Sequence, residues 1–164
     1  MPTPLDLSYA TITLTQGQVT IVDTADFEWL NQRKWAAQWN KGTRTYYAVG
    51  HDGDYAVRMN RLILGLGYGD NRQGEHISGD TLDNRRSVNL RIATQQQNSW
   101  NQKRHSNNTS GFRGVDWNAR SGKWRARITV GWDTINLGLY STPEEAYESY
   151  CEAAKDYYGE FARL

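Results

Sequence analysis

The chain has 164 residues, a formal net charge of +1 and a single cysteine. This length suits one ordinary domain or two small ones, and one cysteine excludes an internal disulfide or a cysteine-rich zinc site and favours a reducing, intracellular setting. No apolar run approaches the ~18 residues that a membrane helix needs, and the N-terminus lacks the pattern of a secretory signal, so we expect no membrane partner.

Positive charge is concentrated in the middle of the chain. Residues 56–110 contain eight Lys and Arg against four Asp and Glu, and residues 111–132 contain five against one. Residues 133–164 reverse this balance, with two basic and seven acidic side chains. A locally basic surface attracts phosphate groups even when the whole chain is nearly neutral, so the middle segments are candidates for contact with nucleic acid.

The first hundred residues predict a β-rich segment with short helices. Alternating apolar and polar residues on both sides of Gly17 indicate a β-hairpin, and the pattern of Phe27, Leu30 and Trp35 indicates a short helix after the capping residues 23–26. The elements expected next are strands over 39–49 and 54–59 around turns at 40–42 and 52–53, a helix over 60–64, a polar loop over 65–74, and a helix, or a loop followed by a helix, over 84–101.

The remaining residues predict a second module. The segment 103–111 contains no large apolar residue and is the expected linker, and three short strands are predicted over 112–140. A helix then begins at Pro143, with Thr142 as N-cap and Glu145 completing a capping box, and it ends at Gly159. We therefore expect an α+β protein of two modules, residues 1–105 and residues 106–164.

The most informative motif is the acidic-histidine pair Glu75-His76, which is followed by an Asn-Leu-Arg beginning at Asn89 and then by Asn98. Hydrolysis of a phosphodiester needs one divalent metal and one general base at a fixed separation, and this stretch can supply both. The simpler alternative is a histidine in a turn and an asparagine that caps a helix. The whole constellation favours the nuclease interpretation over that alternative.

Residues 74–98, together with the Arg-Leu-Ile-Leu sequence before them, resemble the HNH endonuclease family, in particular the phage and intron-encoded homing endonucleases whose third motif residue is Asn. The resemblance implies a ββα-metal fold, in which two short strands and a helix hold one divalent ion, Mg²⁺ or Mn²⁺ and not zinc. It also implies that His76 is the general base, that Asn89 orients His76, and that Glu75 and Asn98 bind the metal. The residues expected to contact phosphates are Arg85, Arg86 and Arg91.

Two departures from the family pattern keep an alternative open. Glu75 stands where the family usually has Asp, and Val88 reads as one inserted residue before Asn89. An extra methylene displaces a carboxylate by over ~1 Å, where a functional site needs placement within ~0.5 Å. The alternative is therefore a non-enzymatic DNA-binding or regulatory protein with a decayed catalytic centre.

The strand expected around Arg125 has two different faces. Alternation places Trp124 and Ile128 on one face and Arg125, Arg127 and Thr129 on the other. The apolar set can cover a helix, and the exposed guanidinium groups can pair with guanine or with phosphate. A face that is merely charged is the simpler alternative, but five basic residues within fifteen positions, opposed by a single Asp, favour DNA binding.

The sequence pieces Phe-Arg-Gly-Val, Gly-Lys-Trp-Arg-Ala-Arg-Ile and Thr-Pro-Glu-Glu-Ala give residues 110–164 a resemblance to the AP2/ERF DNA-binding domain. The resemblance implies a three-stranded antiparallel sheet packed on one helix, with the open face of the sheet in the major groove. It assigns DNA contacts to Arg113, Gly114, Arg125, Arg127, Thr129, Thr134 and Asn136. Trp117 and Arg120, beside them, complete the expected DNA-binding set.

We therefore predict a site-directed, metal-dependent DNA endonuclease, a hydrolase of the homing type that cuts one or both strands. The expected partner is double-stranded DNA, bound by a monomer. The resemblance suggests a phage-borne enzyme that acts in the cytoplasm of a bacterial host. RNA is a less favoured partner, because arginines on a sheet suit the B-form major groove better than the deep, narrow groove of RNA.

Overall fold

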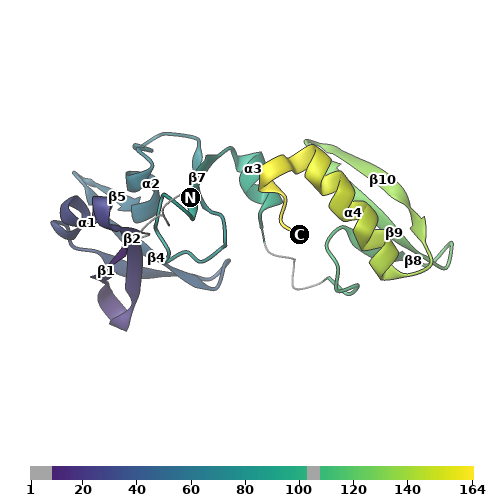
Figure 1. The fold of residues 1–164 in the computed structure, drawn as a ribbon, viewed down its shortest axis with the longest axis horizontal. Helices are drawn as coiled ribbons and strands as arrows, with labels where there is room; N and C mark the ends of the chain where they lie inside the picture. Colours follow the sequence, from purple (N-terminus) through teal and green to yellow (C-terminus); the bar gives the residue numbers. More distant parts are fainter. Residues whose placement is uncertain (1–8, 103–107) are drawn as a thin grey trace, which may run out of the picture. The chain divides into compact units, whose positions relative to one another are not determined.

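The computed structural model describes residues 9–102 and 108–164, and it divides the chain into two compact units with a boundary after Gln95 (Figure 1). The boundary expected at residues 105 and 106 lies outside the described residues. The rings of Trp100 and Tyr158 stack with their centroids 4.5 Å apart, which ties the segment after Gln95 to the second unit. No helix in the described ranges is long and apolar enough to cross a membrane.

The described part of the first unit contains three small antiparallel sheets. These are the hairpin of β1 (Tyr9–Thr13) and β2 (Val19–Asp23), the meander of β3 (Ala36–Asn40), β4 (Thr45–Asp52) and β5 (Tyr55–Arg58), and the hairpin of β6 (Gln73–His76) and β7 (Leu90–Ala93). The helical elements are η1 (Thr15–Gly17), α1 (Thr24–Asn31) and α2 (Met59–Ile63).

Local signals in the sequence account for several of these elements. The predicted β-hairpin is confirmed, and Gly17 lies in its turn with φ of +69°, a conformation that glycine adopts without a Cβ penalty. The expected turn at 40–42 is confirmed, and it separates two strands, β3 and β4, where one strand over 39–49 was expected. The Asn40 Oδ1 atom accepts from the backbone N–H groups of Gly42 and Thr43, at 2.9 and 3.2 Å, and so stabilises that turn.

Strand β7 was not predicted. The sequence indicates a helix, or a loop followed by a helix, over 84–101, whereas residues 90–93 pair with β6 before α3 (Gln95–Trp100) begins. Only Leu90 and Ala93 of this four-residue strand are buried, so it carries no alternating pattern. Its hydrogen-bonding partner, β6, lies about fifteen residues earlier, so the strand depends on a non-local pairing.

The core of the first unit joins all of its sheets. Val22, Leu30 and Met59 are fully buried, and Leu90 packs into the same cluster. The indole of Trp35 donates to the Leu30 carbonyl at 2.9 Å, which satisfies its one polar group inside that core. The β6–β7 hairpin, which carries the Glu-His motif, is therefore attached to a scaffold built by the N-terminal half of the unit.

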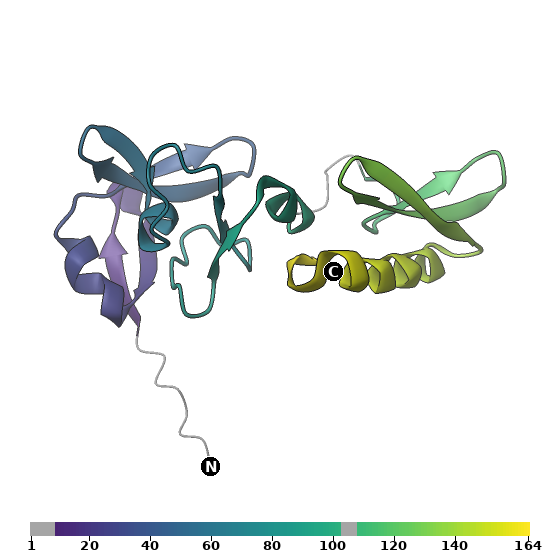
Figure 2. The same ribbon diagram turned by 90° about the horizontal axis from the view of Figure 1, so that it is seen from above.

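The second unit has the predicted α+β arrangement of three strands and one helix. After α3, the chain forms β8 (Val115–Asn118), β9 (Lys123–Val130) and β10 (Asp133–Tyr140), which pair antiparallel in the order β10-β9-β8, followed by α4 (Pro143–Tyr158) and η2 (Gly159–Phe161). Helix α4, yellow in Figures 1 and 2, lies along one face of the green sheet.

The predicted limits of α4 are confirmed. The Thr142 Oγ1 atom accepts from the backbone N–H of Glu145 while the Glu145 carboxylate accepts from the backbone N–H of Thr142, which is a complete capping box. Gly159 ends the helix with φ of +55°. Between sheet and helix, Ile128 and Tyr150 are buried, and burial raises the pKa of Tyr150 to about 12.

Candidate functional site

His76 is the last residue of β6 and is buried, with 7% of its surface exposed. Its Nε2 atom lies 3.1 Å from Asn84 Oδ1, and its ring meets the ring of Tyr47 edge-on at 6.1 Å. Burial lowers the pKa of His76, and this effect outweighs the opposing ones of the Asn84 hydrogen bond and the nearby aspartates. The imidazole is therefore neutral near pH 7, which is the form that can accept a proton.

The side chain of Asn89, which was predicted to orient His76, forms hydrogen bonds with the backbone of the loop between β6 and β7. Its Oδ1 atom accepts from the backbone N–H of Ser78 at 2.8 Å, and its Nδ2 atom donates to the carbonyls of Asp83, at 2.7 Å, and Asp80, at 3.2 Å. Asn89 thus fixes the loop between β6 and β7, while Asn84 holds the ring. The role of Asn84 was missed because an asparagine between charged residues gives no sequence signal of its complete burial.

Glu75, the predicted metal ligand, is 3% exposed and forms an ion pair inside the β6–β7 hairpin. Arg91, its cross-strand neighbour, donates from Nε to Glu75 Oε2. The other carboxylate oxygen, Oε1, is buried and has no hydrogen-bond partner in the described structure. A buried acceptor without a partner is costly, so this oxygen is the atom of the site that a cation would satisfy.

The other predicted metal ligand, Asn98, lies on α3 in the second unit. No group of three or more His, Cys, Asp or Glu side chains suited to a metal occurs in residues 9–102 and 108–164. The predicted ligands are the Glu75 carboxylate and the Asn98 carboxamide, and an asparagine does not count toward such a group. Metal binding by these two residues stays a prediction.

All three arginines predicted to contact phosphates form ion pairs within the first unit. Arg91 pairs with Glu75, Arg85 pairs with Asp83 at 2.6 Å, and Arg86 pairs with Asp26, whose side chain is completely buried on α1. These side chains therefore shape the loop before β7. Any phosphate contact by them requires that an internal ion pair be shared or exchanged.

The N-terminal hairpin also holds this loop. Ser87 donates from its backbone N–H and its hydroxyl to the Asp23 carboxylate, at 3.0 and 2.6 Å. The backbone N–H of Ile21 donates to the Leu82 carbonyl at 2.9 Å, and the N–H of Asn84 donates to the Ile21 carbonyl at 2.7 Å. The loop of the Glu-His motif is thus bound to β2, with which it forms an isolated parallel bridge between Ile21 and Asp83.

Arg58 was not predicted as a functional residue. Its guanidinium lies over the ring of Tyr47, 4.0 Å from the centroid, and Tyr47 in turn packs on His76. In the part of the chain that the structure describes, no carboxylate forms an ion pair with Arg58. Its charge is close enough to contribute to the lowered pKa of His76, so Arg58 is a cation beside the candidate base.

The open face of the second sheet carries a compact charged network. Asp116 accepts from Arg125 at 2.7 Å and from Arg127 at 2.9 Å. Burial alone would raise the pKa of Asp116, but the hydrogen bonds and charges of the two arginines outweigh it and lower that pKa. The Arg125 Nε atom is buried without a partner in the described structure, which leaves one donor of this network unused.

Several residues of the predicted DNA-binding set lie on this open face. Thr129 and Thr134 are cross-strand neighbours with their hydroxyl oxygens 3.2 Å apart, and Asn136 stands opposite Arg127 in the register of β9 and β10. Arg120 lies in the exposed turn between β8 and β9. The face thus combines hydrogen-bond donors and acceptors with two organised guanidinium groups, which is the chemistry that reads base edges.

Two residues of the expected DNA-binding set, Trp117 and Gly114, do not lie on the open face of the sheet. Trp117 shares the face of Val115, which is buried under α4, and its ring meets that of Trp124 at 5.2 Å. Gly114 packs against α4 with φ of +72°, and a Cβ there would lie 2.1 Å from Tyr150 Cδ2. Gly114 is therefore a packing position, where any side chain would collide with the helix.

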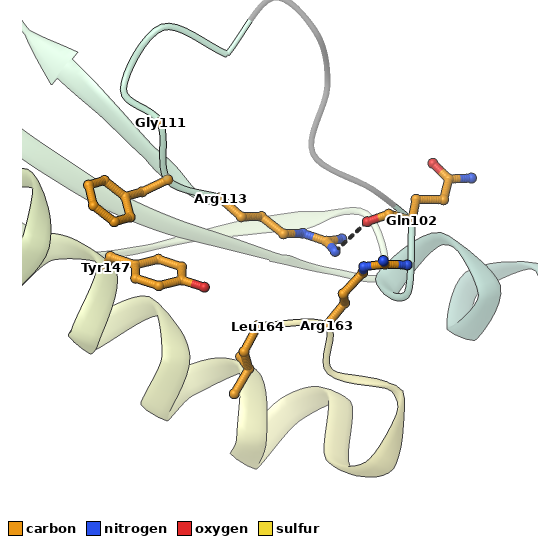
Figure 3. Close-up of a pocket in the computed structure, with 7 residues that line it drawn as sticks. Gln102, Gly111, Arg113, Tyr147, Arg163 and Leu164 are labelled. Atoms are coloured by element: carbon orange, nitrogen blue, oxygen red, sulfur yellow. Dashed lines mark hydrogen bonds between the residues drawn. The ribbon is translucent and has the colours of Figure 1, made fainter. Parts of the chain in front are cut away.

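Arg113 lines a pocket of about 370 Å³ beside α4 and not the open face. Its guanidinium donates to the carbonyls of Gln102, at 2.8 Å, and Ser99, at 3.2 Å, as Figure 3 shows for Gln102. Tyr147 and Arg163 line the same pocket. Arg113, to which the resemblance assigns a DNA contact, thus binds the end of α3 and the residues that follow it.

Trp132 was also missed. It occupies the tip of the β9–β10 hairpin beside Gly131 and is fully exposed. The Gly-Trp-Asp sequence marks the turn, but a turn signal alone does not say that a tryptophan there is left without a packing partner.

Comparisons with known proteins support the expected C-terminal AP2 module directly, and they include one relative that is named as an HNH endonuclease. The AP2 domain family model matches residues 110–160. An uncharacterized HNH endonuclease, L560 of Acanthamoeba polyphaga mimivirus, is 36% identical over 88 residues, which are 54% of this chain and 44% of the viral protein. No solved structure showed a significant match.

Protein 3.8 of Escherichia phage T7 is 33% identical over 90 residues, which make up 55% of this chain and 73% of the phage protein. An identity at this level over most of a relative establishes common descent. The chain carries an AP2 domain and belongs to the family of phage T7 protein 3.8.

Proposed function

We propose that this protein is a metal-dependent DNA endonuclease that its AP2 domain directs to DNA. The observation that carries the proposal is His76, a buried and neutral imidazole held by Asn84 at the end of a strand, with the cation of Arg58 nearby. The order strand, loop, strand, helix over β6, β7 and α3 and the similarity to a viral protein named as an HNH endonuclease support it. A homing role in a phage-infected cell, exercised by a monomer, is part of the same proposal.

In this mechanism each residue has a distinct task. His76 accepts a proton from the attacking water, and Arg58 holds a phosphate oxygen of the backbone beside it. Glu75 and Asn98 are the residues that would hold a divalent cation through oxygen atoms, and the unsatisfied Oε1 of Glu75 is the observation that fits such an ion. A divalent cation such as Mg²⁺, if bound there, would supply positive charge beside the phosphate and the leaving oxygen.

Cleavage of supercoiled plasmid is the direct test. We expect Mg²⁺ or Mn²⁺ to support nicking or linearisation and EDTA to abolish it, because the reaction needs the bound cation. Arg58→Gln should lower kcat/KM roughly tenfold by removing a charge-assisted phosphate contact, whereas Lys41→Gln, in the exposed turn between β3 and β4, should leave it unchanged. Cutting that persists in EDTA, or equal losses in the two variants, would contradict this mechanism.

The DNA-binding part of the proposal rests on the open face of the AP2 sheet. Arg127→Ala is expected to weaken binding to a specific duplex by roughly 1–3 kcal/mol if this guanidinium reads a guanine. Lys155→Ala is the matched control, since it removes the same charge from the exposed surface of α4, on the other side of the sheet. Fluorescence anisotropy at fixed salt measures both, and equal affinities for the two variants would exclude this face as the reading surface.

A second function has one observation in its favour. The ion pair between Glu75 and Arg91 engages the carboxylate that the metal requires, as expected for a DNA-binding protein whose catalytic centre has decayed. Binding that depends on Arg127, without cleavage in either Mg²⁺ or Mn²⁺, would establish this alternative.

A further inference from the structure

Three buried side chains form a hydrogen-bonded chain that ends on His76. The Thr20 hydroxyl donates to the Leu82 carbonyl at 2.7 Å, Asn84 Nδ2 donates to Thr20 Oγ1 at 2.8 Å, and Asn84 Oδ1 lies 3.1 Å from His76 Nε2. Thr20 is 0% exposed and Asn84 is 1% exposed, so water does not compete for these bonds. Thr20 belongs to β2, more than fifty residues before the motif.

The bond from the Thr20 hydroxyl to the Leu82 carbonyl determines which group donates in each of the other hydrogen bonds of this series. A carbonyl oxygen has no proton to donate, so two oxygens 2.7 Å apart require that the Thr20 hydroxyl gives its only proton to Leu82. Thr20 Oγ1 can then only accept from Asn84, which forces the amide nitrogen of Asn84 toward Thr20 and its oxygen toward His76. An acceptor facing Nε2 requires a proton on that nitrogen.

We propose that Thr20 is a positioning residue that sets the tautomer of His76, with the proton on Nε2 and the lone pair on Nδ1. Reversing the Asn84 amide would set its oxygen against the lone pairs of Thr20 and its NH₂ group against Nε2, and would break both bonds. The catalytic meaning of this tautomer rests on the proposed function, since Nδ1 is then the nitrogen that accepts a proton from water. The tautomer itself does not depend on any activity.

Nitrogen NMR of the labelled full-length protein tests the proposal, because the two ring nitrogens of a neutral histidine have different chemical shifts according to which one carries the proton. The chain has three histidines, and His51→Asn and His105→Asn identify the signals of His76 by elimination. In the unmodified protein, at a pH where the ring is neutral, we expect the proton on Nε2. A proton on Nδ1 would overturn the proposal without the use of any variant at Thr20.

Thr20→Val and Thr20→Ser form the matched pair. Valine keeps the shape but removes the hydroxyl, so the Asn84 amide loses its fixed orientation and the His76 spectrum should show both tautomers. Serine keeps the hydroxyl and should keep the single tautomer. A valine variant that folds, by circular dichroism, and retains the pure Nε2 tautomer would contradict the role of Thr20.

Cleavage kinetics separate this inference from the proposed function. If the protein cuts DNA, Thr20→Val should lower kcat about 10- to 100-fold with KM for DNA unchanged, and Thr20→Ser should restore kcat. The protein could instead cut no DNA, show the proton of His76 on Nε2, and lose this single tautomer in Thr20→Val. In that case the role of Thr20 in setting the tautomer is supported and the endonuclease proposal fails.

Discussion

Replacing His76 is expected to reduce DNA cleavage by about 10²–10⁴-fold while leaving the affinity for DNA within twofold of the original. The imidazole is the candidate general base, and the affinity comes from the open face of the AP2 sheet. His76→Gln is preferable to His76→Ala, because the ring is buried and the larger side chain leaves a smaller cavity. Single-turnover cleavage and anisotropy on the same preparation measure the two quantities.

The matched control is His51→Gln. His51 lies at the exposed end of β4, where its carbonyl accepts from Arg33, and it takes no part in the Asn84 network. Its replacement should change neither cleavage nor binding. Equal loss of cleavage in both variants would point to a general effect on the fold, and unchanged cleavage in His76→Gln would remove this residue from the mechanism.

The second large effect is expected on stability. Gly114→Ala would place a Cβ 2.1 Å from Tyr150 Cδ2 and 2.7 Å from the Arg127 carbonyl oxygen, at a φ of +72°. Overpacking and the left-handed backbone together should lower the free energy of unfolding of the second unit by about 3–5 kcal/mol. Denaturant titration followed by tryptophan fluorescence measures this loss.

Gly122→Ala separates the two causes. Gly122 has a similar φ of +63°, but nothing lies within 4 Å of the position of its Cβ. Backbone strain alone should therefore cost about 1 kcal/mol at this turn. Equal destabilisation in the two variants would mean that the contact with Tyr150 is unimportant, and that Gly114 is required for some other reason, such as the DNA contact assigned by family resemblance.

The sequence predicted best those elements whose causes are local. The capping box of Thr142 and Glu145 defines the start of α4, and the alternation around Arg125 and Arg127 defines the two faces of β9. Each of these signals lies within four residues of the element it specifies. The AP2 match over residues 110–160 agrees with this part of the prediction.

The candidate catalytic site was predicted only as a set of residue types. That Asp26 would neutralise Arg86, or that Asn84 and not Asn89 would hold His76, depends on contacts between residues that the fold brings together. Sequence spacing says which groups a site could use, whereas ion pairs and amide orientations follow from tertiary packing. Arg58 was overlooked for the same reason, because its neighbour Tyr47 lies on a different strand.

The attachment of the motif loop to the N-terminal hairpin sets a lower limit on any smaller version of this protein. Asp23, Ile21 and Thr20 together form six hydrogen bonds with residues 82–87. A fragment cut just upstream of Glu75 would keep every residue of the motif and lose the groups that give it shape. Moving the Glu-His motif into another scaffold therefore means carrying β2 and α1 with it, together with β1, the strand that pairs with β2.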